Sequence, residues 1–162
     1  VELRDIISPY TADMPLYIVP FTEIQLEIHE KCPAEFMITI MRRFMMRIAS
    51  VLAKKEGCSA IITGECLGQV ASQTVESMTS TESCAELPVF RPLIAFDKDE
   101  TMALAARIGT YETSIQPFED CCTIFLPKNP SIHPNLKKVI EAENKLDIDA
   151  LVARAIEAVQ KC

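Results

Sequence analysis

The chain has 162 residues, of which 49% are hydrophobic and 24% are charged, and its formal net charge at pH 7 is −7. This length and composition suit one folded domain with a real core and exclude wholesale disorder. The acidic balance argues against a stand-alone nucleic-acid-binding protein, because neutralising phosphates requires concentrated lysine and arginine.

The compartment can also be inferred from the sequence. No apolar run approaches the roughly 20 residues of a membrane helix, and no signal peptide is visible, so we expect a soluble, cytoplasmic protein with no membrane partner. Seven cysteines are an odd number, and their spacing is not that of a disulfide framework, which favours a reducing cytosol. The chain begins with Val1, which suggests an excised piece of a longer protein.

The first third of the chain predicts a strand, a short helix and a long helix. The strand covers 15–20 between prolines, and Thr22 is expected to cap the short helix. The long helix is expected over 34–55, with one apolar stripe and with Gly57 as its C-cap. Its opposite face is expected to point to solvent and carries these residues: Arg43, Arg47, Ser50 and Lys54.

The middle of the chain continues this alternation. A second strand is expected over 59–63, a helix over 69–78, and an extended piece over 89–94 that Pro92 interrupts. A further helix should then open with a capping box formed by Asp97 and Glu100, and it should end at Gly109.

The end of the chain is expected to be helical after an irregular stretch. Residues 111–130 hold too many prolines for regular structure, and two helices should follow, one after Pro134 and one opened by Asp147 or Asp149. Strands that alternate with helices predict an α/β fold with a largely parallel sheet, in a single domain over 1–162.

The turn between the second strand and the next helix is a candidate ligand site. Gly64 and Gly68 lie in it, and ligands of doubly wound sheets bind where strands end and helices begin. The pattern is neither a Walker A loop nor a G-x-G-x-x-G fingerprint, so an ordinary strand-to-helix turn remains the alternative.

Cationic residues are further candidates. Arg42 and Arg43 form one candidate, because a guanidinium fork suits phosphate oxygens and Arg42 lies near the edge of the apolar stripe of the long helix; a solvated basic helix face is the alternative. Lys98 lies in the first turn of its helix, where the helix dipole disfavours a cation. That position indicates either an anionic ligand or a tolerated surface lysine.

The adjacent pair Cys121 and Cys122 lies in the irregular stretch. A reactive thiol must be accessible and have a low pKa; a loop supplies access, but the carboxylates of Glu119 and Asp120 oppose a low pKa. No metal site is expected, because the two histidines of the chain lack the spacing of metal ligands.

Four strings give the sequence a family resemblance. They are MRRFMM at 41–46, TGECLGQVASQT at 63–74, RPLI at 91–94 and EDCC at 119–122. In this order and spacing they resemble the catalytic domain of the tRNA 4-thiouridine synthases, or tRNA sulfurtransferases, over Leu16 to Leu146. The family often has serine at the position of Cys66.

The resemblance implies a Rossmann-like fold of the ATP-pyrophosphatase type, with a mostly parallel sheet and helices on both faces. It implies an enzyme that uses ATP, with Mg²⁺, to adenylate uridine 8 of tRNA and then replaces the activated oxygen with persulfide sulfur. The product is 4-thiouridine, and the same sulfur can supply thiamine thiazole synthesis. The cofactor-binding residues implied are Arg42, Gly64 and Gln73, and the catalytic residues implied are Cys121 and Lys98.

The resemblance also implies partners and missing parts. A cysteine desulfurase would donate the sulfur, tRNA would bind mainly through domains upstream of this chain, and a homodimer is allowed. The glycine-rich pyrophosphate loop of the family should lie before Leu16, yet residues 1–15 contain no glycine. We therefore expect a partial catalytic domain. The alternatives are a related ATP-pyrophosphatase that activates another oxygen without sulfur transfer, and a non-catalytic assembly fragment.

Overall fold

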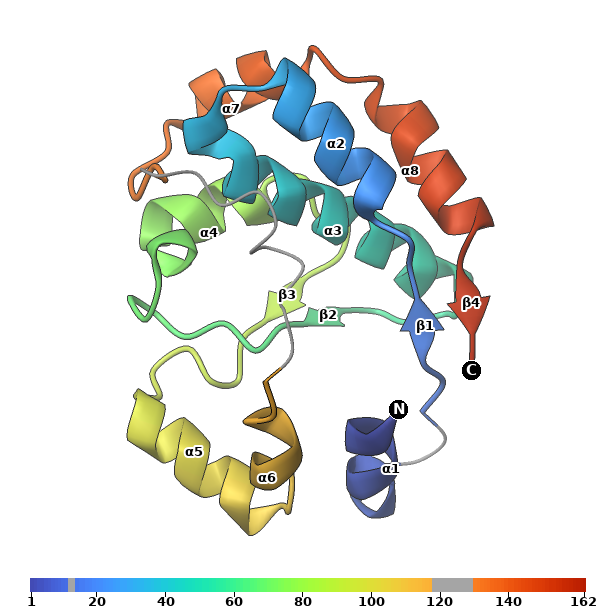
Figure 1. Cartoon of the computed structure of the whole chain (residues 1–162), viewed down its shortest axis with the longest axis vertical. Coiled ribbons are helices and arrows are strands. Elements are labelled where there is room, and N and C mark those ends of the chain that lie inside the picture. Colours follow the sequence, from blue (N-terminus) through green and yellow to red (C-terminus); the bar gives the residue numbers. More distant parts are fainter. Residues whose placement is uncertain (12–13, 118–129) are drawn as a thin grey trace.

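The computed structural model describes residues 1–11, 14–117 and 130–162 (Figure 1). The α-helices in these ranges are α1 (Glu2–Ile7), α2 (Thr22–Lys31), α3 (Met37–Lys55), α4 (Val75–Glu82), α5 (Lys98–Arg107), α6 (Tyr111–Ser114), α7 (Leu136–Glu143) and α8 (Ile148–Glu157). Short 3₁₀ helices are η1 (Ser8–Tyr10), η2 (Ala34–Phe36) and η3 (Ala71–Gln73). The strands are β1 (Tyr17–Ile18), β2 (Ile61–Ile62), β3 (Val89–Phe90) and β4 (Gln160–Lys161).

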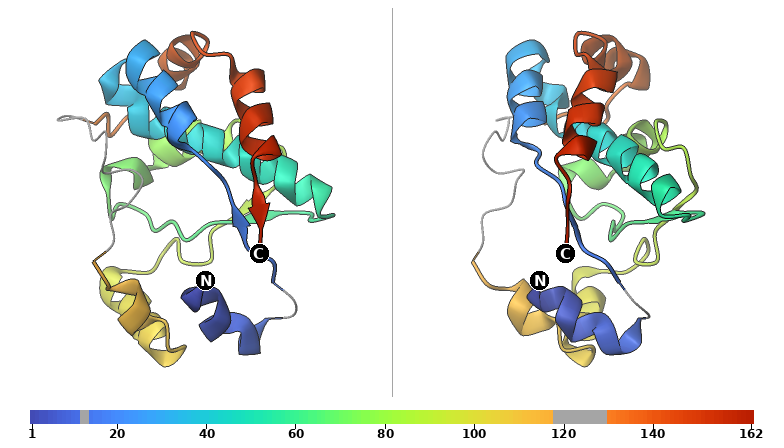
Figure 2. Two further views of the ribbon diagram at one scale, coloured as in Figure 1. Left: turned by 45° about the vertical axis from the view of Figure 1, so that its right-hand side comes forward. Right: turned by 90° about the vertical axis from the view of Figure 1, so that its right-hand side faces the viewer.

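Helix α3 is the centre of the core. It contacts α2, α4, α7 and α8, and these helices lie together on one side of the strands (Figures 1 and 2). The expected apolar stripe is confirmed, since Met37, Ile40, Met41, Phe44 and Ile48 are all buried. The main core cluster joins this stripe to the apolar faces of α2, α7 and α8.

The opposite face of α3 corrects the sequence-based expectation. Arg43 and Ser50 are buried there, whereas a solvent-exposed face was predicted. The reason is that α4 and α7 cover this side, so that Arg43 meets Glu143 of α7 and the carbonyl of Ser80 at the end of α4. Polar residues on a helix are therefore not always solvated; these are buried because they have partners.

The strands form two small sheets instead of the single, mostly parallel sheet that was expected. Within the described residues, β2 pairs with β3 in parallel, and β1 pairs with β4 antiparallel. Prolines limit both pairings, because Pro20 follows the first strand while Pro88 and Pro92 flank β3, and proline cannot donate to a ladder. The α/β class is confirmed, but the strands are only two residues long.

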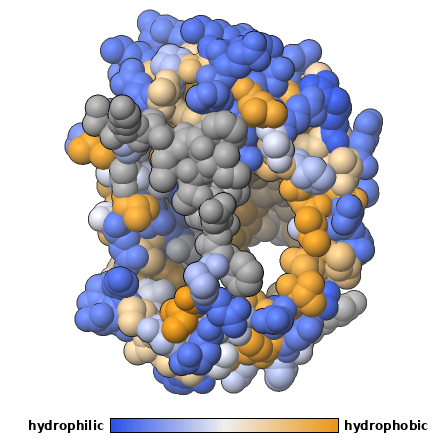
Figure 3. Space-filling view, viewed as in Figure 1, coloured by the Kyte–Doolittle hydropathy of each residue, from blue (hydrophilic) through white to orange (hydrophobic). Residues whose placement is uncertain are grey.

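The faces of the parallel pair differ. Ile61 is buried on the side of α3. Ile62 is 71% exposed, and Phe90, which pairs with Ile62 across the two strands, is 59% exposed. The expected cover of helices on both faces is therefore wrong for this pair within the described residues. The space-filling view shows an opening beside the strands with hydrophobic residues on part of its rim (Figure 3).

A second group of helices, α1, α5 and α6, lies beyond the strands at the other end of the molecule (Figures 1 and 2). None of these three helices contains a buried residue. None of the helices in the described ranges combines the length and the hydropathy needed to cross a bilayer.

Helix boundaries show where local sequence signals succeed and fail. Gly57 ends α3 with φ +72°, and the capping box of Asp97 and Glu100 opens α5, both as predicted. Thr22, expected to be a cap, is instead the first residue of α2. The helix expected over 69–78 begins only at Val75, because the side chain of Thr74 accepts from the amide of Ser77 and fixes the helix start there.

Candidate functional site

The segment after β2 is a closed turn pinned to the segment after β3. The amide of Thr63 donates to Phe90 at 3.0 Å and that of Leu67 donates to Ile94 at 3.0 Å, so the two segments run side by side. Within the turn, the amide of Gly68 donates to the carbonyl of Gln73 at 2.8 Å. Gly68 has φ +76°, a conformation that other residues rarely adopt, and this explains a glycine at that position.

Gly64 has a different explanation. A Cβ added there would meet nothing within 4 Å, and its backbone is not left-handed. Neither packing within the described chain nor backbone strain therefore demands glycine at this exposed position. A glycine here leaves the backbone open to close approach by a ligand, at the carboxyl end of β2.

A buried carboxylate lies directly after Gly64. Glu65 is only 3% exposed and accepts hydrogen bonds from the hydroxyl of Thr63 at 2.9 Å and from Nε of Arg91 at 2.7 Å. It also forms an ion pair with Nη2 of Arg42 from α3. A buried carboxylate is stable only when it is paired in this way.

Arg42 is held from two sides. Besides the ion pair with Glu65, its Nη1 donates to the hydroxyl of Ser72 in η3 at 3.1 Å. Residue 73, the next along η3, is Gln73, whose side-chain oxygen accepts from the amide of Cys66 at 3.2 Å. The residues implied as ATP contacts therefore lie close together: Arg42 is bonded to Ser72 and Glu65, which are the chain neighbours of Gln73 and Gly64.

Arg91 completes this network from the end of β3. Its Nη1 donates to Glu82 of α4 at 2.6 Å. Burial works to lower the pKa of Arg91, but the hydrogen bonds and charges of Glu82 and Glu65 outweigh it, so the pKa lies above its ordinary value. Its Nη2 is buried without a hydrogen-bond partner in the described part of the chain.

Lys98 is placed as predicted, at the first position of α5 and exposed. It lines a cavity of about 380 Å³ together with Gly68, Gln69 and the segment 94–97. The side chain of Gln69 donates to the carbonyl of Phe96 at 3.5 Å across this cavity. The lysine therefore lies beside the glycine turn and is separate from the Arg42 network.

Cys121 and Cys122 lie outside the described residues. The chain is described again from residue 130, where the amide of Ser131 donates to Glu35 and the carbonyl of Ile132 accepts from Thr74 at 2.6 Å. Residue 132 is therefore anchored next to Gln73. Among the described thiols, burial raises the pKa of both Cys32 and Cys84, which makes them poor nucleophiles.

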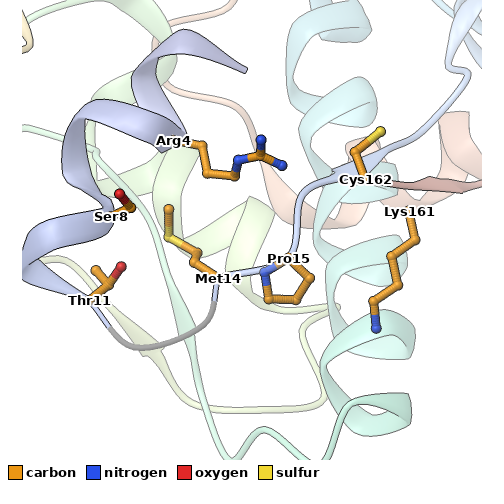
Figure 4. Close-up of a pocket in the computed structure, with 7 residues that line it drawn as sticks. All are labelled: Arg4, Ser8, Thr11, Met14, Pro15, Lys161 and Cys162. Atoms are coloured by element: carbon orange, nitrogen blue, oxygen red, sulfur yellow. The ribbon is translucent and has the colours of Figure 1, made fainter.

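Another cavity, of about 710 Å³, lies between the N-terminal segment and the β1·β4 pair (Figure 4). Arg4 and Lys161 supply its cationic side chains. Both are already paired, Arg4 with Asp5 and Lys161 with Glu56. None of the residues singled out from the sequence lines this cavity.

Sequence reasoning missed Glu65, Arg91 and Ser72 as members of the network. A signal for all three was present, since Glu65 and Ser72 belong to the string at 63–74 and Arg91 begins the RPLI string. Only the fold shows that Glu65 and Arg91 meet, because 26 positions separate them in the chain.

Comparison with known proteins agrees with this architecture. A solved structure described as a 4-thiouridine synthetase–RNA complex with bound ATP superposes with a TM-score of 0.91 at 39% identity, covering 99% of this chain and 42% of that one. A probable tRNA sulfurtransferase of Caldanaerobacter subterraneus subsp. tengcongensis is 54% identical over 159 residues, which are 98% of this chain and 42% of the relative. One of Acetivibrio thermocellus is 52% identical over 157 residues, 97% of this chain and 40% of the relative.

These likenesses define an α/β domain of the ATP-pyrophosphatase type. More particularly, the chain belongs to the family described as thiamine biosynthesis protein (ThiI), whose model matches residues 2–148. The chain spans about two fifths of the length of the curated relatives named above.

Proposed function

We propose that this chain is the nucleotide-binding and sulfur-transferring part of a tRNA sulfurtransferase, which converts uridine 8 of tRNA to 4-thiouridine. The observation that carries the proposal is the network joining Arg42, the Gly64 turn and Gln73 at the carboxyl end of β2. Family membership and the ATP-bound, RNA-bound structure with a TM-score of 0.91 support it.

In this proposal the glycine turn and its neighbours bind ATP. The open backbone at Gly64 admits the nucleotide, Arg42 donates to it, and Gln73, whose side chain accepts from the amide of Cys66, is the third contact. The described residues hold no group of three or more histidine, cysteine or acidic side chains that could bind a metal ion. We therefore assign no ligand for Mg²⁺ to this part of the chain.

The sulfur chemistry follows from activation of the uracil oxygen. Oxygen O4 attacks the α-phosphate of ATP and pyrophosphate leaves, so that AMP becomes the leaving group at C4. A persulfide sulfur then attacks C4 and displaces AMP, which leaves the uracil joined to the enzyme through an S–S bond. A second enzyme thiol attacks the enzyme-side sulfur of that bond, so that 4-thiouridine leaves and an enzyme disulfide forms, which a dithiol reductant returns to two thiols. We assign to Cys121 either the persulfide that attacks C4 or the second thiol that cleaves the S–S bond, and we assign to Lys98 the stabilisation of charge on the adenylated intermediate.

The partners follow from the same proposal. A cysteine desulfurase supplies the persulfide sulfur, and tRNA is held mainly by upstream domains of a longer protein, since this chain has a net charge of −7. We also propose that the sulfur serves thiamine thiazole synthesis, which the description of the matching family supports.

The decisive experiment follows sulfur on the protein at its natural length. The protein is incubated with a cysteine desulfurase and cysteine, and its peptides are mapped by mass spectrometry for persulfide. We expect persulfide on the peptide that contains Cys121, and we expect it to disappear when ATP and tRNA are added. Cys121→Ser should abolish 4-thiouridine formation, while the exposed Cys58→Ser serves as the matched control.

Two outcomes would contradict the proposal in different ways. ATP cleavage to pyrophosphate with no persulfide on this peptide would indicate a related pyrophosphatase that activates another oxygen. A protein that neither binds ATP nor carries persulfide on this peptide would instead be a folded, non-catalytic assembly domain.

A further inference from the structure

We propose that Glu65 is a positioning residue for the nucleotide site, which fixes Arg42 and the Gly64 turn in the conformation that receives ATP. This inference rests on the proposed function in one respect, namely that ATP binds at this turn. Glu65 belongs to the TGE string, but neither that string nor the comparisons assign a role to its side chain.

The first argument is the burial of Glu65 at a surface turn. Gly64 before it and Leu67 two positions after it are exposed, whereas the Glu65 side chain is 4% exposed and Cys66 is also buried. Glutamate is rarely buried unless its charge is compensated, because moving a carboxylate out of water is costly. Thr63, Arg42 and Arg91 supply that compensation, and each comes from a different segment of the network.

The second argument is what Glu65 does to Arg42. Nη2 of Arg42 is held by Glu65 and Nη1 by the hydroxyl of Ser72 at 3.1 Å, so the plane of the guanidinium is fixed before any ligand arrives. A guanidinium has five N–H donors, so these two contacts leave donors for a nucleotide. A ligand that meets a pre-oriented arginine does not have to order a flexible side chain on binding.

The third argument is continuity along the backbone. Gly64 precedes Glu65, and the amide of Cys66 immediately after it donates to the side chain of Gln73 at 3.2 Å. Anchoring the Glu65 side chain therefore fixes the backbone on both sides of it. Arg91 anchors the carboxylate to α4 through Glu82, so the turn is tied to two helices, α3 and α4.

A second buried glutamate provides a matched comparison. Glu143 is 1% exposed and also pairs with two arginines, both of them from α3. Its partners are Arg43 and Arg47, and it ties α3 to α7, with no contact to the glycine turn. Glu143 therefore has the same kind of stabilising interaction without the link to the nucleotide.

The test measures ATP affinity by isothermal titration calorimetry, with the protein at its natural length. Glu65→Gln keeps the size of the side chain and removes its charge, and we expect the Kd for ATP to rise about tenfold, the loss of one charge-assisted contact. Glu143→Gln should leave the Kd within about twofold of the wild type, because an interaction remote from the ligand should not couple to it. In a kinetic assay of pyrophosphate release, Glu65→Gln should raise the KM for ATP by a larger factor than it lowers kcat.

A double-mutant cycle separates positioning from general stabilisation. Because Glu65 acts partly through Arg42, Glu65→Gln should raise the Kd by a smaller factor in an Arg42→Ala background than in the wild type. Thr63→Val, which removes only the hydroxyl bond to Glu65, provides a milder variant should Glu65→Gln fail to fold, and we expect about a threefold rise in Kd.

Each result bears on the inference. Additive effects of Glu65→Gln and Arg42→Ala, or equal effects of Glu65→Gln and Glu143→Gln, would overturn it while leaving the nucleotide site intact. An unchanged Kd in Thr63→Val, where Glu65→Gln does not fold, would also overturn it. A wild-type protein that binds no ATP would instead overturn the proposed function and, with it, this inference.

Discussion

Glu143 links α7 to the face of α3 that bears Arg43 and Arg47. Its carboxylate accepts from Nε of Arg43 at 3.0 Å and from Nη1 and Nη2 of Arg47 at 2.6 and 2.9 Å. Burial by itself would raise the pKa of Glu143, but the hydrogen bonds and charges of Arg47 and Arg43 outweigh burial, so its pKa lies below the ordinary glutamate value. The folded state therefore favours the ionised form.

Removing this carboxylate should strongly destabilise the fold. In Glu143→Ala, two arginines lose their shared partner in the core, and we expect the free energy of unfolding to fall by about 3–5 kcal/mol. Urea denaturation at pH 7 measures this free energy. As the control, Glu141→Ala on the exposed side of the same helix should change the free energy of unfolding by less than about 0.5 kcal/mol.

The same variants have an expected pH dependence. Because the folded pKa of Glu143 is lowered, its contribution is fully present above the unfolded pKa of about 4.3 and is lost as pH falls through the lower folded value. The stability difference between wild type and Glu143→Ala should accordingly shrink as pH falls below about 4.3. A difference that stays constant down to pH 2 would mean that the carboxylate contributes through packing and not through charge.

At the level of single residues, motifs propose candidates but not their contacts. Arg42, Gly64 and Gln73 stay predicted ATP contacts, and the ion pairs of Glu65 with Arg42 and Arg91 become visible only when α3 and the segment after β3 are placed around it. Arg43 was assigned to solvent because helical periodicity describes one element and contains no information about Glu143, 100 positions away.

Helix α5 illustrates how local signals determine an element independently of packing. Its capping box has both bonds, from the amide of Glu100 to Asp97 at 2.8 Å and from the amide of Asp97 to Glu100 at 2.9 Å. Yet the helix has no buried residue, so its stability depends largely on this cap and on intrinsic propensity. Lys98 is the first residue of α5, so the cap also determines where this lysine lies.

Asp97→Ala should therefore open α5 locally. We expect the cap to contribute about 1 kcal/mol to the free energy of opening α5. Its loss should therefore speed amide hydrogen exchange in α5 about fivefold, with little change in the global melting temperature. Asn135→Ala is the matched control, because Asn135 caps α7, whose Val139 and Glu143 are in the core. That variant should lower the global stability instead. Equal global losses in both variants would show that α5 is coupled to the core.

Elements with strong local signals were predicted, and elements that depend on tertiary partners were not. The apolar stripe of α3, the Gly57 terminus and the Asp97 cap are properties of contiguous sequence. By contrast, β4 has two exposed, polar residues and forms only because β1 is available to pair with it. The start of α4 was missed because a serine or threonine before a helix is common, and only the hydrogen bond identifies Thr74 as the cap.

The whole molecule is asymmetric about its strands. On one side, α3 is enclosed by four helices and has nine buried residues, and on the other side α1, α5 and α6 have none. The Gly64 turn follows β2, between these two parts, and Lys98 begins α5 on the weakly packed side. The exposed face of Ile62 and Phe90 belongs to the strands between the two parts. The candidate site thus has a rigid contribution from α3 and a weakly packed one from α5.

This asymmetry predicts the pattern of amide hydrogen exchange across the molecule. Helices α5 and α8 make a matched pair, since each has ten residues and an aspartate cap, but only α8 packs on α3 and buries Leu151 and Ala155. Because opening α8 requires breaking core contacts, its amides should exchange at least about tenfold more slowly than those of α5, and those of α3 should be slowest. Hydrogen exchange followed by mass spectrometry at neutral pH measures the exchange rates of all three helices. Protection of α5 equal to that of α8 would contradict this prediction and would mean that α5 is covered by a surface beyond the described residues.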